Sequence, residues 1–175
     1  MYKVVNMSMS TSRRAPALIE IKHKTTGELL YLVEARNLMG IDLRGAVLVG
    51  ANLSRQNLSR ANLEGADLQE ADMSFSMLYN TRLVRAKLCR AHLQGASFHS
   101  SDLTEADLTE ANLYHTNLVL CDLTRAVLRG AKFWGADLTG AVLTEANLQG
   151  ATFDAETVWP ADFDPLRHGA TPLPG

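Results

Sequence analysis

The side chains best suited to catalysis or metal binding are few, and their spacing matches no reactive motif. The chain contains five histidines and two cysteines. No serine lies in a G-x-S-x-G turn, and the chain has no H-E-x-x-H, no C-x-x-C and no phosphate-binding glycine loop. We therefore expect no enzyme, and so no catalytic residue, no metal site, no cofactor and no small-molecule substrate. The residues in question are His23, His92, His99, His115, His168, Cys89 and Cys121.

The element that must position these side chains is a five-residue repeat. A large apolar residue occupies every fifth position from Leu38 to Phe153, and these 24 residues are 20 leucines, one methionine and three phenylalanines. Two residues before each stands a small residue, which is alanine in 16 of the 24 units. The unit reads Ala-(Asp/Asn)-Leu-x-x. We number its positions one to five, so that Ala61 is at position one and Leu63 at position three.

A period of five fits neither a helix nor a flat strand. Five residues turn an α-helix by about 500°, so the leucines would not form one stripe. On a strand, residues five apart point in opposite directions. All leucines share one interior if each unit is one side of a square coil of 20 residues, with positions one and three pointing inward.

The position-one residues test this number of sides. When the units are sorted by four, two sides have only alanine at position one, and all exceptions fall on the other two sides. Opposite charges also recur 20 residues apart, as in Arg85, Glu105, Arg125 and Glu145. We expect the inward polar residues at 56, 76, 81, 101 and 116 to bond backbone between coils. A lined internal channel is the alternative, which the large neighbouring leucines oppose. The exceptions are Arg36, Ile41, Gln56, Ser76, Thr81, Ser101, Thr116 and Cys121.

The repeat from 36 to 155 resembles the pentapeptide repeat family, and the stretch "WPADFDP" resembles the C-terminal tails of small cyanobacterial members. The resemblance implies an all-β solenoid, a right-handed quadrilateral β-helix, here of about six four-sided coils. Residues of the predicted structural core are Leu78, Leu83, Leu88, Phe98, Leu103, Leu108, Phe133 and Phe153.

The segments outside the repeat predict two caps. We expect residues 1–17 to be a flexible N-terminal segment and residues 18–35 to be a β-hairpin cap, with Gly27 in its turn. The β-helix takes residues 36–155, and residues 156–175 form a C-terminal cap and tail. In the tail, Asp164-Pro165 predicts a helix start and Gly169 its end. Trp159 and Phe163 are expected to cover the last coil near Phe153.

Charge argues against a DNA mimic, a function known in this family for inhibitors of gyrase, a type II topoisomerase. The repeat has 13 acidic and 11 basic residues, so it lacks the continuous acidic stripe that would imitate phosphates. The most acidic outward row is interrupted by Arg82. The DNA mimic is kept as the alternative function. The row is Asp42, Asn62, Arg82, Asp102, Asp122 and Val142.

Outward-facing aromatic residues are the main indication of function. Tyr114 and Trp134 stand 20 residues apart and should stack, with His115 beside them and Tyr79 on the adjacent side. These four are our candidate partner-binding residues, although an aromatic ladder that only stabilises the coils is the other interpretation. We expect a non-catalytic scaffold or interaction protein that presents a side face to an unidentified protein partner. A homodimer stays open.

The remaining composition predicts compartment and excludes other partners. A net charge of −2 gives no general attraction to nucleic acid or to acidic membranes. The chain has no signal-peptide pattern and no long apolar run, so we expect no membrane association. Cys89 is expected to point outward and Cys121 inward on coils too far apart for a disulfide, which suits a reducing, cytoplasmic location.

Overall fold

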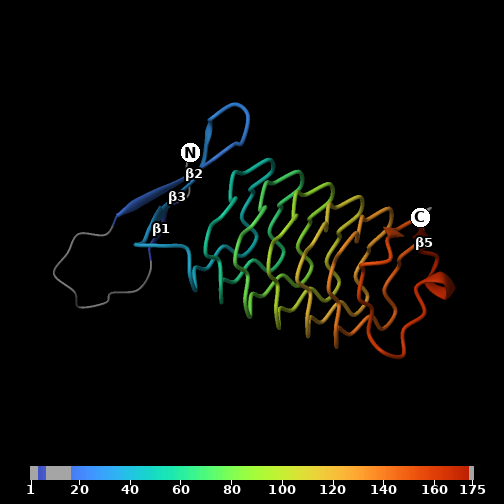
Figure 1. Ribbon diagram of the computed structural model, residues 1–175. Coiled ribbons are helices and arrows are strands. Elements are labelled where there is room, and N and C mark those ends of the chain that lie inside the picture. The colour runs from blue at the N-terminus through green and yellow to red at the C-terminus, as the bar shows by residue number, and fades with distance from the viewer. Residues whose placement is uncertain (1–3, 7–16, 174–175) are drawn as a thin grey trace.

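The repeat winds into a stack of coils in the computed structural model, which describes residues 4–6 and 17–173 (Figure 1). Parallel bridges join residues 20 apart, and one row of bridges connects Asp42, Asn62, Arg82, Asp102 and Asp122 in succession. Four such rows run along the stack, five residues apart in sequence. The 20-residue period predicted from the sequence is therefore present, with four units in each coil.

The backbone hydrogen bonds explain why one unit repeats. The N–H of position one donates within its own coil, that of position two donates to the preceding coil, and those of positions three and five donate to the following coil. In residues 61–65 these N···O distances are 2.9, 2.8, 2.7 and 2.9 Å. Position four has no backbone acceptor in any described unit, so a side chain or solvent must satisfy it.

Position five lies in the left-handed region throughout the repeat. Every fifth residue from Gly40 to Gly150 has a positive φ; 9 are glycines and 14 are other residues, with φ between 50° and 61°. None of the 14 is valine, isoleucine or threonine, the residues for which this backbone conformation is least favourable. The sharp turn after each leucine thus accounts for the residue types at position five.

Leucine and alanine fill the interior of the coils. Of the predicted core, Leu78 to Phe133 are fully buried, whereas Phe153 in the last coil is partly exposed. Gln56 and Arg36 are exposed, which corrects their inward assignment: both lie near the N-terminal end of the stack, and such long side chains do not fit a slot sized for alanine.

The shorter polar residues at position one do bond the backbone. Thr81 Oγ1 donates to the carbonyl of Leu58 at 2.9 Å, Thr116 Oγ1 donates to that of Leu93 at 2.9 Å, and Ser101 Oγ donates to Leu78 in the same way. All three bonds join adjacent coils. Ser76 differs from the prediction, because its hydroxyl donates to Met73 within its own coil at 2.6 Å.

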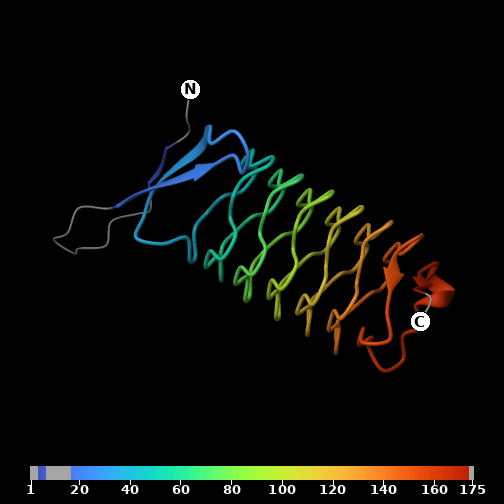
Figure 2. The same cartoon turned by 45° about the horizontal axis from the view of Figure 1, so that its top comes forward.

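A hairpin of β2 (Leu18–Lys22) and β3 (Leu29–Glu34) lies at the N-terminal end of the stack (Figure 2). Gly27 in its turn has φ 69°, as the sequence predicts. The hairpin joins the first coil through an antiparallel bridge between His23 and Ala51. Three of its residues, Ile21, Tyr31 and Val33, belong to the same core as the leucines, so the hairpin shields that end from water.

A third strand, β1 (Val4–Asn6), pairs in parallel with β3, so the sheet order is β1-β3-β2. The expectation of a flexible segment over residues 1–17 did not include this strand. Residues 1–3 and 7–16, on which the rest of that expectation falls, lie outside the described residues, as do residues 174–175.

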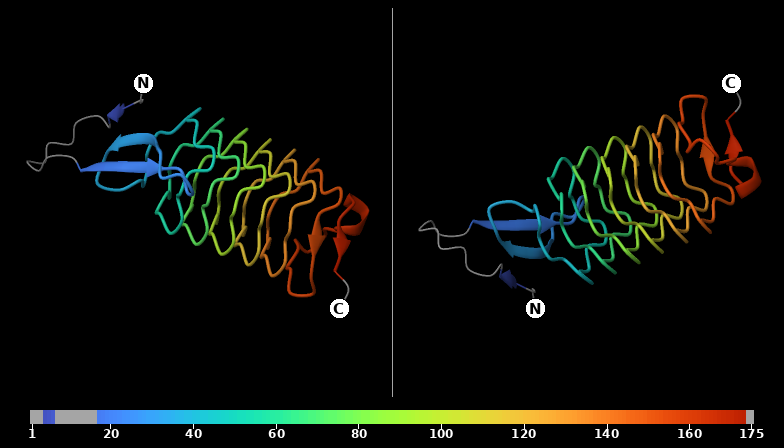
Figure 3. Two further views of the ribbon diagram at one scale, coloured as in Figure 1. Left: turned by 90° about the horizontal axis from the view of Figure 1, so that it is seen from above. Right: turned by 90° about the horizontal axis from the view of Figure 1, so that it is seen from below.

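The C-terminal segment lies at the end of the stack (Figure 3). Its aromatic residues form a lid over the last coil. Trp159 lies against Phe133 and Phe153, with ring centroids 5.2 and 5.5 Å apart, and Phe163 stacks on Trp159 at 5.5 Å, as predicted. The pairing of Asp137 with Val158 spans 21 residues instead of 20, so one extra residue ends the regular coil.

The tail continues from this lid as short elements. Strand β4 (Thr152–Phe153) pairs in parallel with β5 (Thr171–Pro172). Between them lies a 3-10 turn, η1 (Leu166–His168), which Asp164 Oδ1 caps by accepting from the N–H of Leu166 at 3.0 Å. Gly169 ends this turn with φ 85°, as predicted.

Candidate interaction faces

The Asp or Asn side chain at position two accepts a hydrogen bond from the backbone of its own unit. In all fourteen units from 37 to 149 that carry one, its Oδ1 accepts the N–H of position four, the one donor that the backbone leaves unpaired. Such bonds from a side chain to the backbone two residues later stabilise turns. The aspartates at position two are therefore explained without any imitation of DNA.

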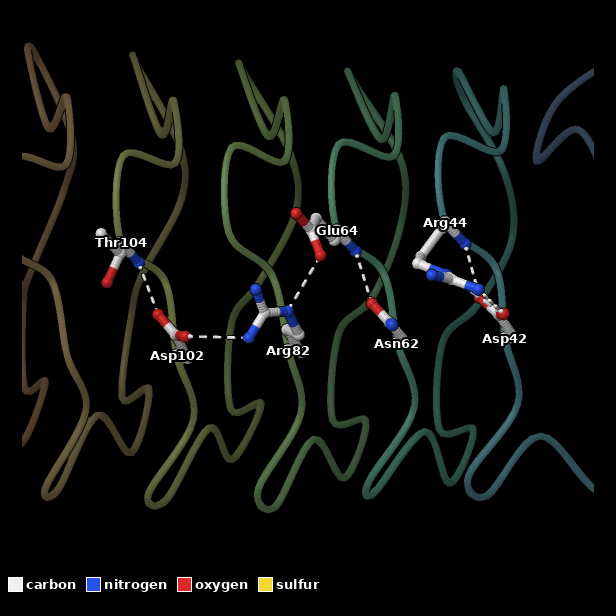
Figure 4. Close-up of polar contacts among 7 residues, drawn as sticks. All are labelled: Asp42, Arg44, Asn62, Glu64, Arg82, Asp102 and Thr104. Atoms are coloured by element: carbon white, nitrogen blue, oxygen red, sulfur yellow. Dashed lines mark hydrogen bonds and ion pairs between the residues drawn. The ribbon is translucent and has the colours of Figure 1, made fainter.

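The most acidic outward row is also neutralised locally (Figure 4). Arg82 Nε donates to Glu64 Oε2 at 3.0 Å, and its Nη1 lies 3.9 Å from Asp102 Oδ2. Asp42 is held by Arg44, whose Nη2 is 2.7 Å from Oδ2. Two of the three carboxylates of this row are thus paired with arginine, so the row lacks the continuous negative stripe that a DNA mimic requires.

Ion pairs between coils balance the charges on the neighbouring corners as well. The guanidinium groups of Arg85 and Arg125, from the coils on either side, each lie 2.7 Å from the carboxylate of Glu105. Arg90 makes the same kind of ion pair with Glu70 at 2.7 Å. These pairs are exposed to solvent, which screens them, so they contribute little to stability. They confirm the predicted 20-residue spacing for Arg85, Glu105 and Arg125.

The candidate partner-binding residues are only partly brought together. Tyr114 and Trp134 stack with centroids 4.3 Å apart and planes 23° apart, and both are half-buried. Trp134 Nε1 donates to Thr152 Oγ1 at 3.1 Å, so this indole is also tied to the next coil. His115 is exposed beside the stack, and its ring lies directly over Gly135, where a Cβ would be 2.2 Å from Nδ1.

Tyr79 lies on the adjacent side among other exposed apolar residues. Phe75, Met77 and Tyr79 are 57%, 39% and 40% exposed, and Leu120 on the same side is 57% exposed. Sequence reasoning did not select Met77. The available signal was its place at position two, where 14 other units have Asp or Asn. The exposed apolar surface is thus centred further toward the N-terminus than the stacked Tyr114 and Trp134.

The two thiols are poor nucleophiles at neutral pH. Burial, together with a hydrogen bond to Asp107, raises the pKa of Cys89 to about 11. Burial raises the pKa of Cys121 to about 12, and its Sγ lies 2.9 Å from the carbonyl oxygen of Phe98 in the adjacent coil. Both cysteines are free thiols, with Cys89 half-buried and Cys121 buried.

Among the described residues, 4–6 and 17–173, no group of three His, Cys, Asp or Glu side chains is placed to hold a metal ion. Within the same residues there is no helix of sufficient length and apolarity to cross a membrane.

Comparison with known proteins identifies the family. The profile described as pentapeptide repeats matches residues 37–74, 78–118 and 121–155 with eight copies. The chain therefore belongs to the pentapeptide repeat family. No curated protein matches it.

Several solved structures of pentapeptide repeat proteins are similar. HetL from the cyanobacterium Nostoc sp. strain PCC 7120, involved in heterocyst differentiation regulation, is 33% identical over 69% of this chain, with a TM-score of 0.45. The chain spans 58% of the length of HetL. A protein from the Arabidopsis thaliana thylakoid lumen is 31% identical over 67% of this chain and 68% of its own, with a TM-score of 0.48.

QnrB1, a plasmid-mediated fluoroquinolone resistance protein, is more distant. It is 20% identical, with 75% of this chain and 79% of that chain covered and a TM-score of 0.35. This likeness concerns the fold alone.

Proposed function

We propose that this protein is a non-catalytic, rigid interaction rod that presents one side face of a right-handed quadrilateral β-helix to a protein partner. The handedness is that of the pentapeptide repeat family. Rigidity follows from a continuous core in which each coil packs on its neighbours. The observation that carries the proposal is the gathering of exposed apolar side chains on one side of the stack, around Phe75, Met77, Tyr79 and Leu120. The stacked pair of Tyr114 and Trp134 lies at the corner that borders this side, with Tyr114 directly before His115.

Affinity capture from cell extract tests this proposal. The full chain serves as bait beside a Tyr114→Thr/Trp134→Thr variant, which removes the stacked pair but keeps a residue common at position four. An Arg85→Ala/Glu105→Ala variant is the matched control, since it removes a stacked pair from a different corner. We expect the wild type and the control to retain the same specific protein and the aromatic variant to lose it. An identical set of captured proteins for all three baits would contradict the role of this pair.

The alternative function is a DNA-mimicking inhibitor of a type II topoisomerase. The ion pairs of Arg82 with Glu64 and Asp102 weigh against it. A gyrase supercoiling assay separates the two functions. Our proposal predicts no inhibition by the wild-type protein at micromolar concentration, and potent inhibition would favour the mimic.

A further inference from the structure

One side of the stack carries no acidic residue over four successive coils, and Asp137 is the first carboxylate further along that side. We call the segments 55–60, 75–80, 95–100 and 115–120 the acid-free face, because they contain no Asp or Glu and lie one above another through the bridges of Asn57, Met77, Ser97 and Asn117. The face does contain two arginines and two histidines. In the same part of the repeat, the other three sides carry every carboxylate.

The cations of this face have no carboxylate partner within the described residues 4–6 and 17–173. Neither Arg55 nor Arg60 makes an ion pair there, whereas arginines at 82, 85, 90 and 125 all do. The guanidinium carbon of Arg55 lies 5.4 Å from the centroid of the exposed Phe75 ring, which in turn lies over Gly95. A positive charge is thus held beside an apolar surface.

Backbone donors are also left open on this face. Met77 and Ser97 replace the usual Asp or Asn at position two, so no described group accepts the N–H of Tyr79 or of His99. Eight other units lack Asp or Asn at position two. In seven of them the unit directly above or below has it, and in the eighth, that of Thr152, Thr157 Oγ1 accepts the N–H of position four instead. Within the described part of the repeat, only here do two adjacent coils present open N–H groups together.

Two buried polar atoms on the same coil are unpaired as well. Ser97 Oγ and Gln94 Oε1 have no hydrogen-bond partner among the described residues, although both atoms are shielded from solvent. Ser97 is at position two of the unit that contains His99, and Gln94 directly precedes Gly95, which begins that segment of the face. Polar groups left in this way favour a ligand that brings its own hydrogen-bonding groups.

We propose that the acid-free face binds an extended acidic protein segment that carries an apolar anchor. A carboxylate of the segment would accept the N–H groups of Tyr79 and His99, replacing the oxygens that Asp or Asn supplies in other coils. Its anchor would pack on Phe75, Met77 and Tyr79, and further acidic side chains would pair with Arg55 and Arg60. This inference rests on the proposed function, to which it adds the face and the chemistry of the partner.

The test uses the full chain and a displayed library of random dodecapeptides. We expect the selected peptides to be enriched in Asp and Glu and to contain at least one Leu, Ile, Phe or Trp. Met77→Asp provides the decisive variant, because it restores the missing acceptor and adds a negative charge. It should preserve or raise the melting temperature yet weaken binding of a selected peptide at least about tenfold, as expected for a misplaced like charge.

Two further variants make the result specific. Val142→Asp makes the same change at position two on another side, where Thr144 also lacks a side-chain acceptor, and should leave binding within about twofold of the wild type. Met77→Asn occupies the N–H of Tyr79 without adding charge, and should weaken binding by less than Met77→Asp does.

Several outcomes would overturn this proposal. They are a selected pool without acidic enrichment, a library that yields no binder, or equal binding by the Met77→Asp and wild-type proteins. Binding of a fluorescein-labelled oligothymidylate that Met77→Asp abolishes would assign the face to nucleic acid instead.

The proposed function is judged separately by the capture experiment. Peptide binding that is lost in Tyr114→Thr/Trp134→Thr but kept in Met77→Asp would refute the acid-free face while leaving the interaction rod intact.

Discussion

At the scale of single residues, position two combines charge and turn formation. Burial opposes ionisation of Asp107, but hydrogen bonds from the Thr109 hydroxyl, the Cys89 thiol and the Thr109 N–H together lower the pKa of this carboxyl below its usual value. Thr109 Oγ1 and N lie 2.6 and 3.0 Å from Oδ1. The ionised carboxylate therefore stabilises the folded state.

The pH dependence of stability follows from this lowered pKa. Because the folded-state pKa lies below the unfolded one, the contribution is fully present above the usual value of about 4 and is lost as the pH falls through the folded value. Asp107→Asn keeps an acceptor for Thr109 but does not ionise. Urea denaturation should show that the wild type exceeds Asp107→Asn in free energy of unfolding by more at pH 6 than at pH 3. An equal difference at both pH values would contradict this role.

Position five offers a second test at this scale. Ser100 has φ 56°, and a β-branched residue is strained there by about 1–2 kcal/mol. Ser100→Val should therefore lower the midpoint of urea denaturation clearly, whereas Ser100→Gly should leave it unchanged or higher. If the two variants were equally stable, the left-handed conformation would not limit the residue types at position five.

At the scale of the elements, the coil was predictable because its period is a packing requirement. Only a backbone that turns every five residues buries Leu78, Leu88 and Phe98 together, and the alanine-only sides fixed the number of sides at four. Gln56 was placed inward because the period ignores side-chain length and the end of the stack. Strand β1 was missed because its pairing with β3 leaves no periodic signal in so short a segment.

Core substitutions measure how tightly the coils pack. Leu88 is fully buried, so Leu88→Ala should destabilise the fold by about 2–5 kcal/mol through loss of burial and formation of a cavity. Ala106 is equally buried, and Ala106→Leu should cost about 1–3 kcal/mol because the enlarged side chain has no space. Thermal unfolding of both variants checks these values, and an unchanged melting temperature for Ala106→Leu would contradict close packing of the alanine side.

The candidate site was less accessible to sequence reasoning than the coil. Tyr114 and Trp134 were found because aromatic residues 20 positions apart must meet in a four-sided stack, and they do. Met77 and the open N–H groups of Tyr79 and His99 were missed, since their meaning depends on which backbone donor each Asp or Asn satisfies. That bond becomes visible only when the hydrogen bonds of a whole unit are traced.

At the scale of the whole molecule, the stack separates four sides that differ in chemistry. Carboxylates and their ion-pair partners occupy three of them over the central coils, and exposed apolar residues with unpaired arginines occupy the fourth. Because neighbouring coils hold one another in register, a partner meets a surface already arranged for it. The central claim is therefore that a single side of the rod makes the contact.

Photocrosslinking around one coil tests this claim most directly. A benzophenone amino acid is placed, one position at a time, at Met77, Arg82, Lys87 and His92, which are exposed residues at position two on the four successive sides. The protein captured from cell extract is then crosslinked and the yield from each position is compared. The account predicts a strong crosslink from position 77 and little from positions 82 and 87. Strong crosslinks from 82 or 87 with none from 77, or equal yields from all four, would contradict it.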